Sequence, residues 1–290
     1  NELVSPYLQN IGTEEQKRYW LPKMVTGEVV TAIAMTEANA GSDLQAIRTQ
    51  AILENDQYHV NGSKTFISNG LHADLIVLVA KTDPQAKAKG ISILLVDAAL
   101  DGVKKGRSLQ KIGLHAQDTA ELFFDDVCVP ATQRLGEEGQ GFAYLMQELP
   151  RERLSISMMA LGAIWGAIEI TKDYVLERKA FGQPLSQMQN TRFVLANAHI
   201  KAKAAQAFVD QCAALYQQHQ LSVTQVAALK CFITDVQCEV IDQLLQLFGG
   251  YGYMQEYPIS RFFVDARVQK IYGGTNEIMK EIVARELLGK

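Results

Sequence analysis

The chain has 290 residues and a formal net charge of −4, which is enough length for one large domain or two smaller ones with a substantial core. The negative charge disfavours a nucleic-acid partner, because phosphate binding needs lysines and arginines gathered on one face. The four cysteines show no CxxC spacing and none of the five histidines pairs at ligand spacing, so reduced thiols and no metal site are predicted.

The distribution of apolar residues and the start of the chain also bear on membrane insertion and targeting. No stretch is as long and apolar as a membrane span requires, so no span is predicted. The start, Asn1-Glu2-Leu3, lacks the basic-then-apolar layout of a signal peptide. It also lacks a methionine and opens in an apparently helical segment, which suggests a fragment of a longer protein.

Residues 1–27 are predicted to form short helices that cannot fold alone. Thr13-Glu14-Glu15-Gln16 resembles a capped helix start, and Gly27 is a helix stop. Residues 28–136 then change to β-branched runs separated by turn residues such as Asn61-Gly62 and Asn69-Gly70, which predicts a compact antiparallel sheet or β-barrel. The predicted strands are Val29–Thr36, Ala51–Leu53, Tyr58–Asn61, Thr65–Ser68, Leu75–Ala80, Ile91–Val96 and Glu121–Val129.

Residues 137–290 are predicted to be helical and to form a four-helix bundle with an appended tail. Pro150 is expected at the first turn of a long helix, where its missing N–H costs nothing. The later helices are predicted from about Gln187 to Gln218, from the capping box at Ser222 to Gly249, from Pro258 to Gln269, and after Thr275. The fold class is therefore α+β and multidomain.

Several catalytic motifs are missing. The chain contains no GxxxxGK[ST], GxSxG or HExxH, and Gly250-Tyr251-Gly252 lacks the third glycine of a dinucleotide-binding fingerprint. These absences disfavour nucleotide hydrolysis, serine-hydrolase chemistry and zinc-dependent proteolysis.

Three stretches could carry a site, and each has a purely structural alternative. Thr36–Asp43 offers hydroxyls and backbone N–H groups to a polar cofactor, or is an ordinary strand-to-loop connection. Glu152 could be a desolvated general base, or a solvated glutamate paired with a neighbouring arginine. Arg178–Gly182 could bind an anionic or aromatic ligand, or simply complement a helix C-terminus. The residues alone leave these alternatives open.

Five stretches together resemble the acyl-CoA dehydrogenase family, in collinear order over essentially the whole chain. They are Met35–Asp43, Asn61–Gly70, Arg178–Gly182, Gln246–Tyr253 and Ile271–Glu277. The resemblance implies an N-terminal helical domain, a middle β-barrel and a C-terminal four-helix bundle in tetramers built as dimers of dimers. Residues 1–27 match only the end of that helical domain. The resemblance also implies a bacterial cytoplasmic or a mitochondrial matrix location.

Carried over by position, the resemblance implies an FAD site. Phe66 stands where tryptophan is commoner and can still cover a flavin ring, and Ser68 keeps a hydroxyl where threonine is usual. The residues implied for this cofactor are Thr36, Gly41, Ser42, Phe66, Ser68, Thr275 and Glu277. A further set, Arg178, Phe181, Gln189, Gln246 and Gly250, is implied to reach the FAD of the neighbouring subunit.

The resemblance also assigns the catalytic base. Many family members carry the catalytic glutamate directly after the tyrosine of the last motif, where this chain has Gly273. Glycine cannot take a proton. The long-chain and isovaleryl members place the base at the start of the bundle helix, which corresponds to Glu152. The surrounding letters are most similar to the long-chain members, and Ser42, Arg153 and Tyr272 are implied to contact substrate.

The expected function is FAD-dependent α,β-dehydrogenation of acyl-CoA thioesters to trans-2-enoyl-CoA, with electrons passed to an electron-transfer flavoprotein. The N–H of Gly273 is implied to bind the thioester oxygen. The same letters fit long straight acyl chains and branched ones. Two alternatives stay open: an acyl-CoA oxidase that uses oxygen, and a non-catalytic flavin- or CoA-binding relative or inactive fragment.

Overall fold

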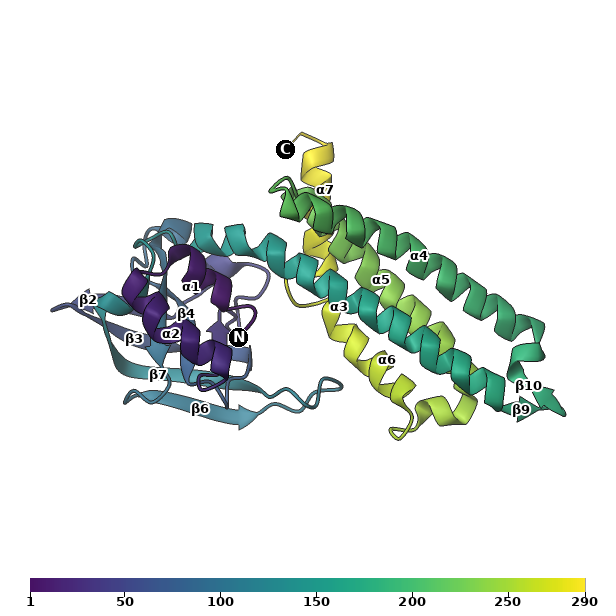
Figure 1. Ribbon diagram of the computed structural model, residues 1–290. Helices are drawn as coiled ribbons and strands as arrows, with labels where there is room; N and C mark the ends of the chain where they lie inside the picture. Colours follow the sequence, from purple (N-terminus) through teal and green to yellow (C-terminus); the bar gives the residue numbers. More distant parts are fainter. Residues whose placement is uncertain (290) are drawn as a thin grey trace. The chain divides into compact units, whose positions relative to one another are not determined.

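The computed structural model describes residues 1–289, which divide into two compact units (Figure 1). The first unit comprises residues 1–111 and 115–148, and the second comprises residues 112–114 and the chain from 149 onward. The α+β class, with a β region followed by a helical region, is as the sequence predicts. Each unit is described below on its own.

The first unit opens with α1 (Ser5–Ile11) and α2 (Glu14–Thr26). The expected cap of α2 is present: the Thr13 hydroxyl accepts from the N–H of Gln16, whose side-chain oxygen accepts from the N–H of Thr13. Gly27 ends the helix with a φ of +78°, a left-handed conformation that glycine adopts at little cost.

Eight strands form one mixed sheet in this unit, in the order β6-β7-β3-β2-β4-β5-β8 with β1 paired to β4. Their bounds are β1 Thr31–Ala34, β2 Gln50–Glu54, β3 Gln57–Ser68, β4 Leu75–Lys81, β5 Ile91–Asp97, β6 Val103–Ser108, β7 Thr119–Pro130 and β8 Arg134–Leu135. Most pairs are antiparallel, as predicted. The β1–β4 pair and the single β2–β4 pairing are parallel, which the prediction of an antiparallel sheet did not include.

Strand β4 shows how the sheet is packed. Its side chains alternate between two cores, because successive residues of a strand point to opposite faces. Val77 and Val79 pack in one core with Tyr7 of α1 and with apolar residues of α2. Ile76 and Leu78 face a second core filled from β1, β2, β3, β5 and β7. The sheet therefore curls around one core, as in a barrel, and carries α1 and α2 over the other.

The Asn61-Gly62 pair is not the turn that the sequence predicts, because β3 continues through it as one strand. The β3–β7 register shifts between Val60 and Gly62, so the dipeptide forms a bulge. A Cβ on Gly62, at a φ of +152°, would lie 2.7 Å from the Cα of Thr49. Strand β6 was also missed, because its charged and mostly exposed sequence lacks apolar alternation.

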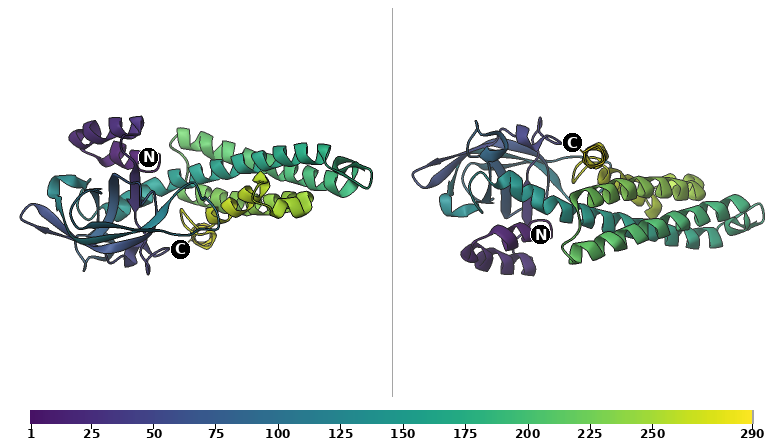
Figure 2. Two further views of the ribbon diagram at one scale, coloured as in Figure 1. Left: turned by 90° about the horizontal axis from the view of Figure 1, so that it is seen from below. Right: turned by 90° about the horizontal axis from the view of Figure 1, so that it is seen from above.

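The second unit is helical. Its helices are residues 149–177 of α3 (Gly141–Glu177), then α4 (Gln189–Gln217), α5 (Val223–Phe248), α6 (Pro258–Gln269) and α7 (Asn276–Leu287). A small hairpin of β9 (Lys179–Ala180) and β10 (Gln183–Pro184) joins α3 to α4. The teal and green helices α3, α4 and α5 run alongside one another in all views (Figure 1, Figure 2). The predicted capping box at Ser222 and Gln225 starts α5.

The long helix α3 begins at Gly141 and not at Pro150, so this boundary was predicted wrongly. Pro150 lies inside the helix, where it offers no N–H to the carbonyl four residues earlier. Glu152 therefore stands in a helix interior and gains nothing from a helix N-terminus.

The expectation that no stretch resembles a membrane span also needs correction. Helix α3 is long enough, and its most apolar window reaches a mean hydropathy of 1.5. Half of that window is buried within the protein. Its apolar residues, including Leu154, Leu161, Ile164 and Ile168, pack with residues of α4 and α5 in the bundle core. Burial in a bundle accounts for this composition.

Candidate functional site

A buried ion pair lies beneath the predicted flavin loop of the first unit. The ammonium of Lys64 on β3 is 2.9 Å from Glu37 Oε1 and 2.9 Å from the carbonyl oxygen of Met35. Glu37 also accepts from the backbone N–H groups of Arg48 and Thr49. Lys64 thus ties the end of the loop that carries Thr36 to the neighbouring strand.

The surroundings shift the pKa values of both Lys64 and Glu37. Burial lowers the pKa of Lys64 to about 8, although the carboxylate of Glu37 opposes that effect. Burial also acts to raise the pKa of Glu37, but the charge of Lys64 and hydrogen bonds from Lys64 and Thr49 outweigh it and lower the pKa. The carboxylate is therefore held ionised, and the loop is held by charge-assisted hydrogen bonds.

Phe66 and Ser68, two predicted flavin contacts, point outward from the end of β3. Phe66 is 68% exposed and has a φ of +58°. This left-handed backbone coincides with a second register shift between β3 and β7, from Lys64 to Ile67. A non-glycine residue in this conformation costs of the order of 1 kcal/mol. The bulge therefore aims an aromatic ring away from the core, where a planar ligand can stack on it.

The three remaining flavin candidates of this unit, Thr36, Gly41 and Ser42, lie on the segment that follows β1. The carbonyl oxygen of Thr36 accepts a hydrogen bond from the N–H of Thr65 at 2.9 Å. Thr65 directly precedes Phe66, so Thr36 lies next to that part of β3. The mutual backbone hydrogen bonds of Glu37 and Ala40 close a tight turn, and Gly41 and Ser42 follow it with exposed backbone. Thr36 is thus tied to β3 next to Phe66, and the exposed Gly41 and Ser42 follow it in the chain.

In the second unit, the helix that carries the candidate base Glu152 is hydrogen-bonded to the turn that carries Gly273. Glu152 is only 6% exposed and the adjacent Arg153 only 5%. Arg153 Nε donates to the carbonyl oxygen of Gly273 at 3.1 Å. Burial lowers the pKa of Arg153, while the carboxylate of Glu152 opposes that shift. Of the alternatives left open above, the solvated glutamate is therefore excluded.

The turn between α6 and α7 is shaped by two glycines. Gly273 has a φ of +65° and Gly274 a φ of +92°, a region that side chains rarely adopt. Tyr272 precedes them, and burial raises its pKa to about 12. The N–H groups of Gly273 and Gly274 have no hydrogen-bond acceptor among residues 1–289. This turn therefore presents unpaired donors next to a half-buried tyrosine.

Thr275 and Glu277 begin α7 directly after that turn. Thr275 is the N-cap, and its hydroxyl accepts from the N–H of Ile278. Glu277 is exposed, and hydrogen bonds from its own backbone and from Thr275 lower its pKa. Both residues thus have a helix-starting role that is independent of any cofactor.

The residues predicted to reach a neighbouring subunit's FAD are only partly gathered. Arg178, Gln246 and Gly250 line one open pocket of about 490 Å³ at the end of α3. The guanidinium of Arg178 lies 5.2 Å from the ring centre of Tyr251, a cation–π contact. Phe181, 97% exposed, and Gln189, the first residue of α4, are not among the lining residues.

Two buried polar residues of this unit were missed by the sequence reasoning. Lys230 on α5 is fully buried, and Asn276 at the start of α7 is 2% exposed. The available signal was the position of Lys230 on the apolar stripe of α5, between Ala227 and Ile233. A lysine at such a position needs a partner inside the core. Among residues 1–289 no group of histidine, cysteine and acidic residues could hold a metal ion.

The fold defines a two-unit α+β architecture in which a β unit precedes a helical bundle. Residues 32–127 match the model of the acyl-CoA dehydrogenase middle domain, and residues 139–288 match that of the C-terminal domain. The chain belongs to the acyl-CoA dehydrogenase family, an oxidoreductase family.

Individual relatives agree with the family models. The mitochondrial long-chain specific acyl-CoA dehydrogenase of Sus scrofa is 48% identical over 99% of this chain and 67% of its own length. A crystal structure of an acyl-CoA dehydrogenase from Geobacillus kaustophilus superposes with a TM-score of 0.97 at 51% identity, covering 99% of this chain and 76% of that one. A chain described with the electron transferring flavoprotein of Acidaminococcus fermentans gives a TM-score of 0.95 at 38% identity, over 99% and 75%. The similarity to the long-chain members is as the sequence motifs predicted.

Proposed function

We propose that this chain catalyses FAD-dependent α,β-dehydrogenation of an acyl-CoA thioester, with Glu152 as the base. The observation that carries the proposal is that a buried carboxylate, Glu152, is adjacent to the arginine that holds the Gly273 turn. By the resemblance described above, Gly273 occupies the position where many family members carry their base, so another carboxylate must supply that function here. Glu152 is the buried candidate on the facing helix.

Each unit by itself offers residues that suit a part of an FAD molecule. The exposed ring of Phe66 and the exposed backbone of Gly41 and Ser42 offer stacking and hydrogen bonding to a planar, polar ring. The pocket of Arg178, Gln246 and Gly250 offers a guanidinium and open backbone to an anionic or aromatic group. When bound, FAD supplies the acceptor for the hydride that leaves the substrate β-carbon.

Distance along the helix supports a second subunit for the Arg178 pocket. At about 1.5 Å per residue, Glu152 and Arg178 lie roughly 39 Å apart along α3 and its end. One FAD site cannot use both residues of the same chain at that separation. The proposal therefore includes a homodimer, within a dimer of dimers, in which Arg178 serves the cofactor of its neighbour.

The protein's own part in the reaction is proton transfer and charge stabilisation. Glu152 takes the α-proton, and the electron pair of that α C–H bond becomes the second bond between the α- and β-carbons as the hydride departs from the β-carbon with its own pair. The unpaired N–H of Gly273 donates to the thioester oxygen, where negative charge develops as the proton leaves. Arg153 holds the next peptide in place through the Gly273 carbonyl. Tyr272 helps to keep water out of the site.

The test is Glu152→Gln, which keeps size and hydrogen bonding but cannot accept the proton. The variant should retain bound FAD and bind palmitoyl-CoA, yet lose anaerobic flavin bleaching by about a thousandfold or more. Glu169→Gln is the matched control, because Glu169 is an exposed carboxylate of the same helix paired to Lys172. Parent-like bleaching by Glu152→Gln would show that the base lies elsewhere.

We further propose that an electron-transfer flavoprotein removes the electrons. The similarity to a chain described with such a flavoprotein supports this choice over direct reaction with oxygen. Turnover of palmitoyl-CoA should therefore need the added flavoprotein. Stoichiometric peroxide without any added acceptor would instead identify an acyl-CoA oxidase.

A further inference from the structure

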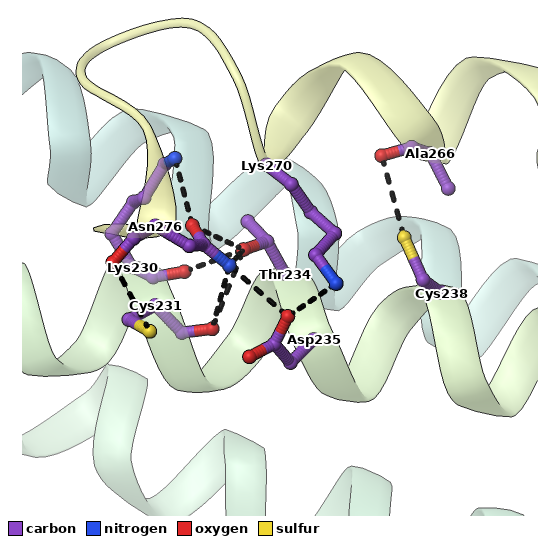
Figure 3. A network of polar contacts seen from close by, with 8 residues as sticks. All are labelled: Lys230, Cys231, Thr234, Asp235, Cys238, Ala266, Lys270 and Asn276. Carbon is purple, nitrogen blue, oxygen red and sulfur yellow. Dashed lines mark hydrogen bonds and ion pairs between the residues drawn. The ribbon is translucent and has the colours of Figure 1, made fainter. Parts of the chain in front are cut away.

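A network of polar side chains joins α5 to the end of α6 and the start of α7, and it has no part in the chemistry proposed above (Figure 3). Lys230 Nζ donates to the carbonyl oxygen of Gly274 at 2.8 Å and to Asn276 Oδ1 at 3.1 Å. Asn276 Nδ2 in turn donates to Asp235 Oδ1 at 3.1 Å. Asp235 forms an ion pair with Lys270 at 2.5 Å.

The burial of Lys230 is costly and is not offset by an ion pair. Its side chain is 0% exposed, and both of its acceptors are neutral oxygens. No carboxylate within salt-bridge distance of Lys230 is present in the described part of the chain. An apolar side chain at this core position would avoid the desolvation of a charge. The lysine at this position therefore costs stability, which indicates a role other than packing.

The amide of Asn276 explains why Lys230 stays in this position. Because the Asn276 NH₂ group is directed to Asp235 and Thr234, its oxygen is left facing Lys230. Asp235 is already neutralised by Lys270, so it does not draw the ammonium away. Lys230 is thus directed to the Gly274 carbonyl by a chain of contacts that runs through α5 and the start of α7.

Two cations hold two successive carbonyls of the same turn. Arg153 from α3 holds the Gly273 carbonyl, and Lys230 from α5 holds the Gly274 carbonyl. In a planar trans peptide a carbonyl and the N–H of the next residue are fixed together, so Arg153 orients the Gly273–Gly274 peptide with the N–H of Gly274, and Lys230 orients the Gly274–Thr275 peptide that closes the turn. Glycines have the largest backbone freedom, and this turn has two in sequence. Without these contacts the N–H groups would not be held in one direction.

We propose that Lys230 is a positioning residue: it holds the Gly274 carbonyl and, together with Arg153, keeps the Gly273-Gly274 turn in one conformation, so that the N–H of Gly273 stays directed at the thioester oxygen of the substrate. The inference rests on the function proposed above for Gly273, and it deepens that function by identifying what restrains the turn that carries the donor. Lys230 does not touch the reacting atoms. It acts through the Gly274 carbonyl, and Asn276 acts through Lys230.

The experiment compares flavin-loaded parent protein with Lys230→Met, which keeps the length of the side chain and removes the ammonium. We expect the rate of anaerobic flavin reduction by palmitoyl-CoA to fall about 10- to 100-fold. The dissociation constant of palmitoyl-CoA should change by less than about threefold. Hydrogen exchange of the 271–275 amides should speed up. The infrared carbonyl band of bound [1-¹³C]trans-2-hexadecenoyl-CoA should move toward its frequency in water, because the carbonyl loses a fixed donor.

The matched control is Lys172→Met, the same change at a half-exposed lysine of α3 paired to Glu169. It should leave all of these measurements at parent values. A second variant, Asn276→Ala, keeps the ammonium but removes the side-chain oxygen that directs it. It should move the carbonyl band and the reduction rate in the same direction by a smaller amount. If Lys230→Met does not fold, Asn276→Ala decides by the same measurements.

The two proposals fail in different ways. A parent protein whose flavin is not bleached by any of butyryl-, octanoyl-, palmitoyl- or isovaleryl-CoA would refute the proposed function. A parent that is bleached, with Lys230→Met or Asn276→Ala unchanged in rate, amide exchange and carbonyl band, would refute the positioning role and leave the function standing. An equal loss of affinity and rate would also overturn it, because that result indicates a general loss of the substrate site.

Discussion

Ile156 of α3 fills the space that a side chain on Gly273 would need: a Cβ built on Gly273 would lie 2.5 Å from Ile156 Cδ1. Ile156 stands four residues after Glu152, so the two side chains share one face of the helix. The helix that carries the candidate base therefore also carries the side chain that would have to move if Gly273 gained a Cβ.

Gly273→Ala should therefore destabilise the protein by about 1–3 kcal/mol, from the left-handed φ and from the close approach to Ile156. Urea unfolding would measure this loss. In the double variant with Ile156→Val, which removes Cδ1, the steric part should be recovered and the backbone part should remain. Equal destabilisation in both backgrounds would show that the side chain of Ile156 does not limit the turn.

The elements with local signals could be predicted from the sequence. The capping boxes at Thr13 and Ser222 and the start of α6 at Pro258 lie where the residue types require them. The predicted start of α3 was wrong, because the local sequence is the same whether a proline occupies the first turn of a helix or lies inside a helix that tertiary packing supports. Helix packing decides between them, and packing is not local.

The candidate site divides in the same way. Glu152 and the flavin residues came from the family motifs, and residue patterns alone left each of them ambiguous. The contacts that hold these residues, Lys64 to Glu37 and Lys230 to Gly274, join positions 27 and 44 residues apart. No periodicity encodes such a pairing. The only local sign of either lysine was a charge placed among core residues.

Lys64→Met should be strongly destabilising, because it leaves the carboxylate of Glu37 buried without its counter-charge. Breaking a buried pair from one side costs about 3–5 kcal/mol. The double variant Glu37→Gln/Lys64→Met should recover part of that loss. Lys104→Met provides the control, since Lys104 forms an exposed pair with Asp125 and should cost less than about 1 kcal/mol. Chemical denaturation of the parent, the two single variants and the double variant would test this order of stabilities.

Arg178→Ala should weaken FAD retention without affecting the fold. The guanidinium is exposed, lines the pocket at the end of α3 and contacts Tyr251. Loss of one charged hydrogen-bonding group corresponds to about 10- to 100-fold weaker binding. FAD remaining after dialysis, measured by absorbance, and dimer mass, measured by light scattering, should fall together. Lys179→Ala, an adjacent exposed cation, should retain both.

Stability should depend on pH through Lys230. Burial lowers the pKa of Lys230 to about 8, and the like charge of Arg153 adds to this effect, while Cys231, Asp235 and Glu277 oppose it. In the unfolded chain the pKa of a lysine is about 10.4. Between these values the unfolded state binds more protons than the folded state, so the free energy of unfolding rises with pH. Below pH 8 both states are protonated, and Lys230 contributes no slope.

The measurement is the difference in free energy of unfolding between the parent and Lys230→Met, from urea titrations at pH 7, 8, 9 and 10. Taking the difference removes the contributions of other lysines and of the thiols, which both proteins share. Relative to the variant, the parent should gain a few kcal/mol from pH 8 to pH 10. Over the same range its flavin-reduction rate should fall relative to the variant, because neutral Lys230 holds the Gly274 carbonyl less strongly. A flat stability difference would mean that Lys230 keeps an ordinary pKa inside the bundle.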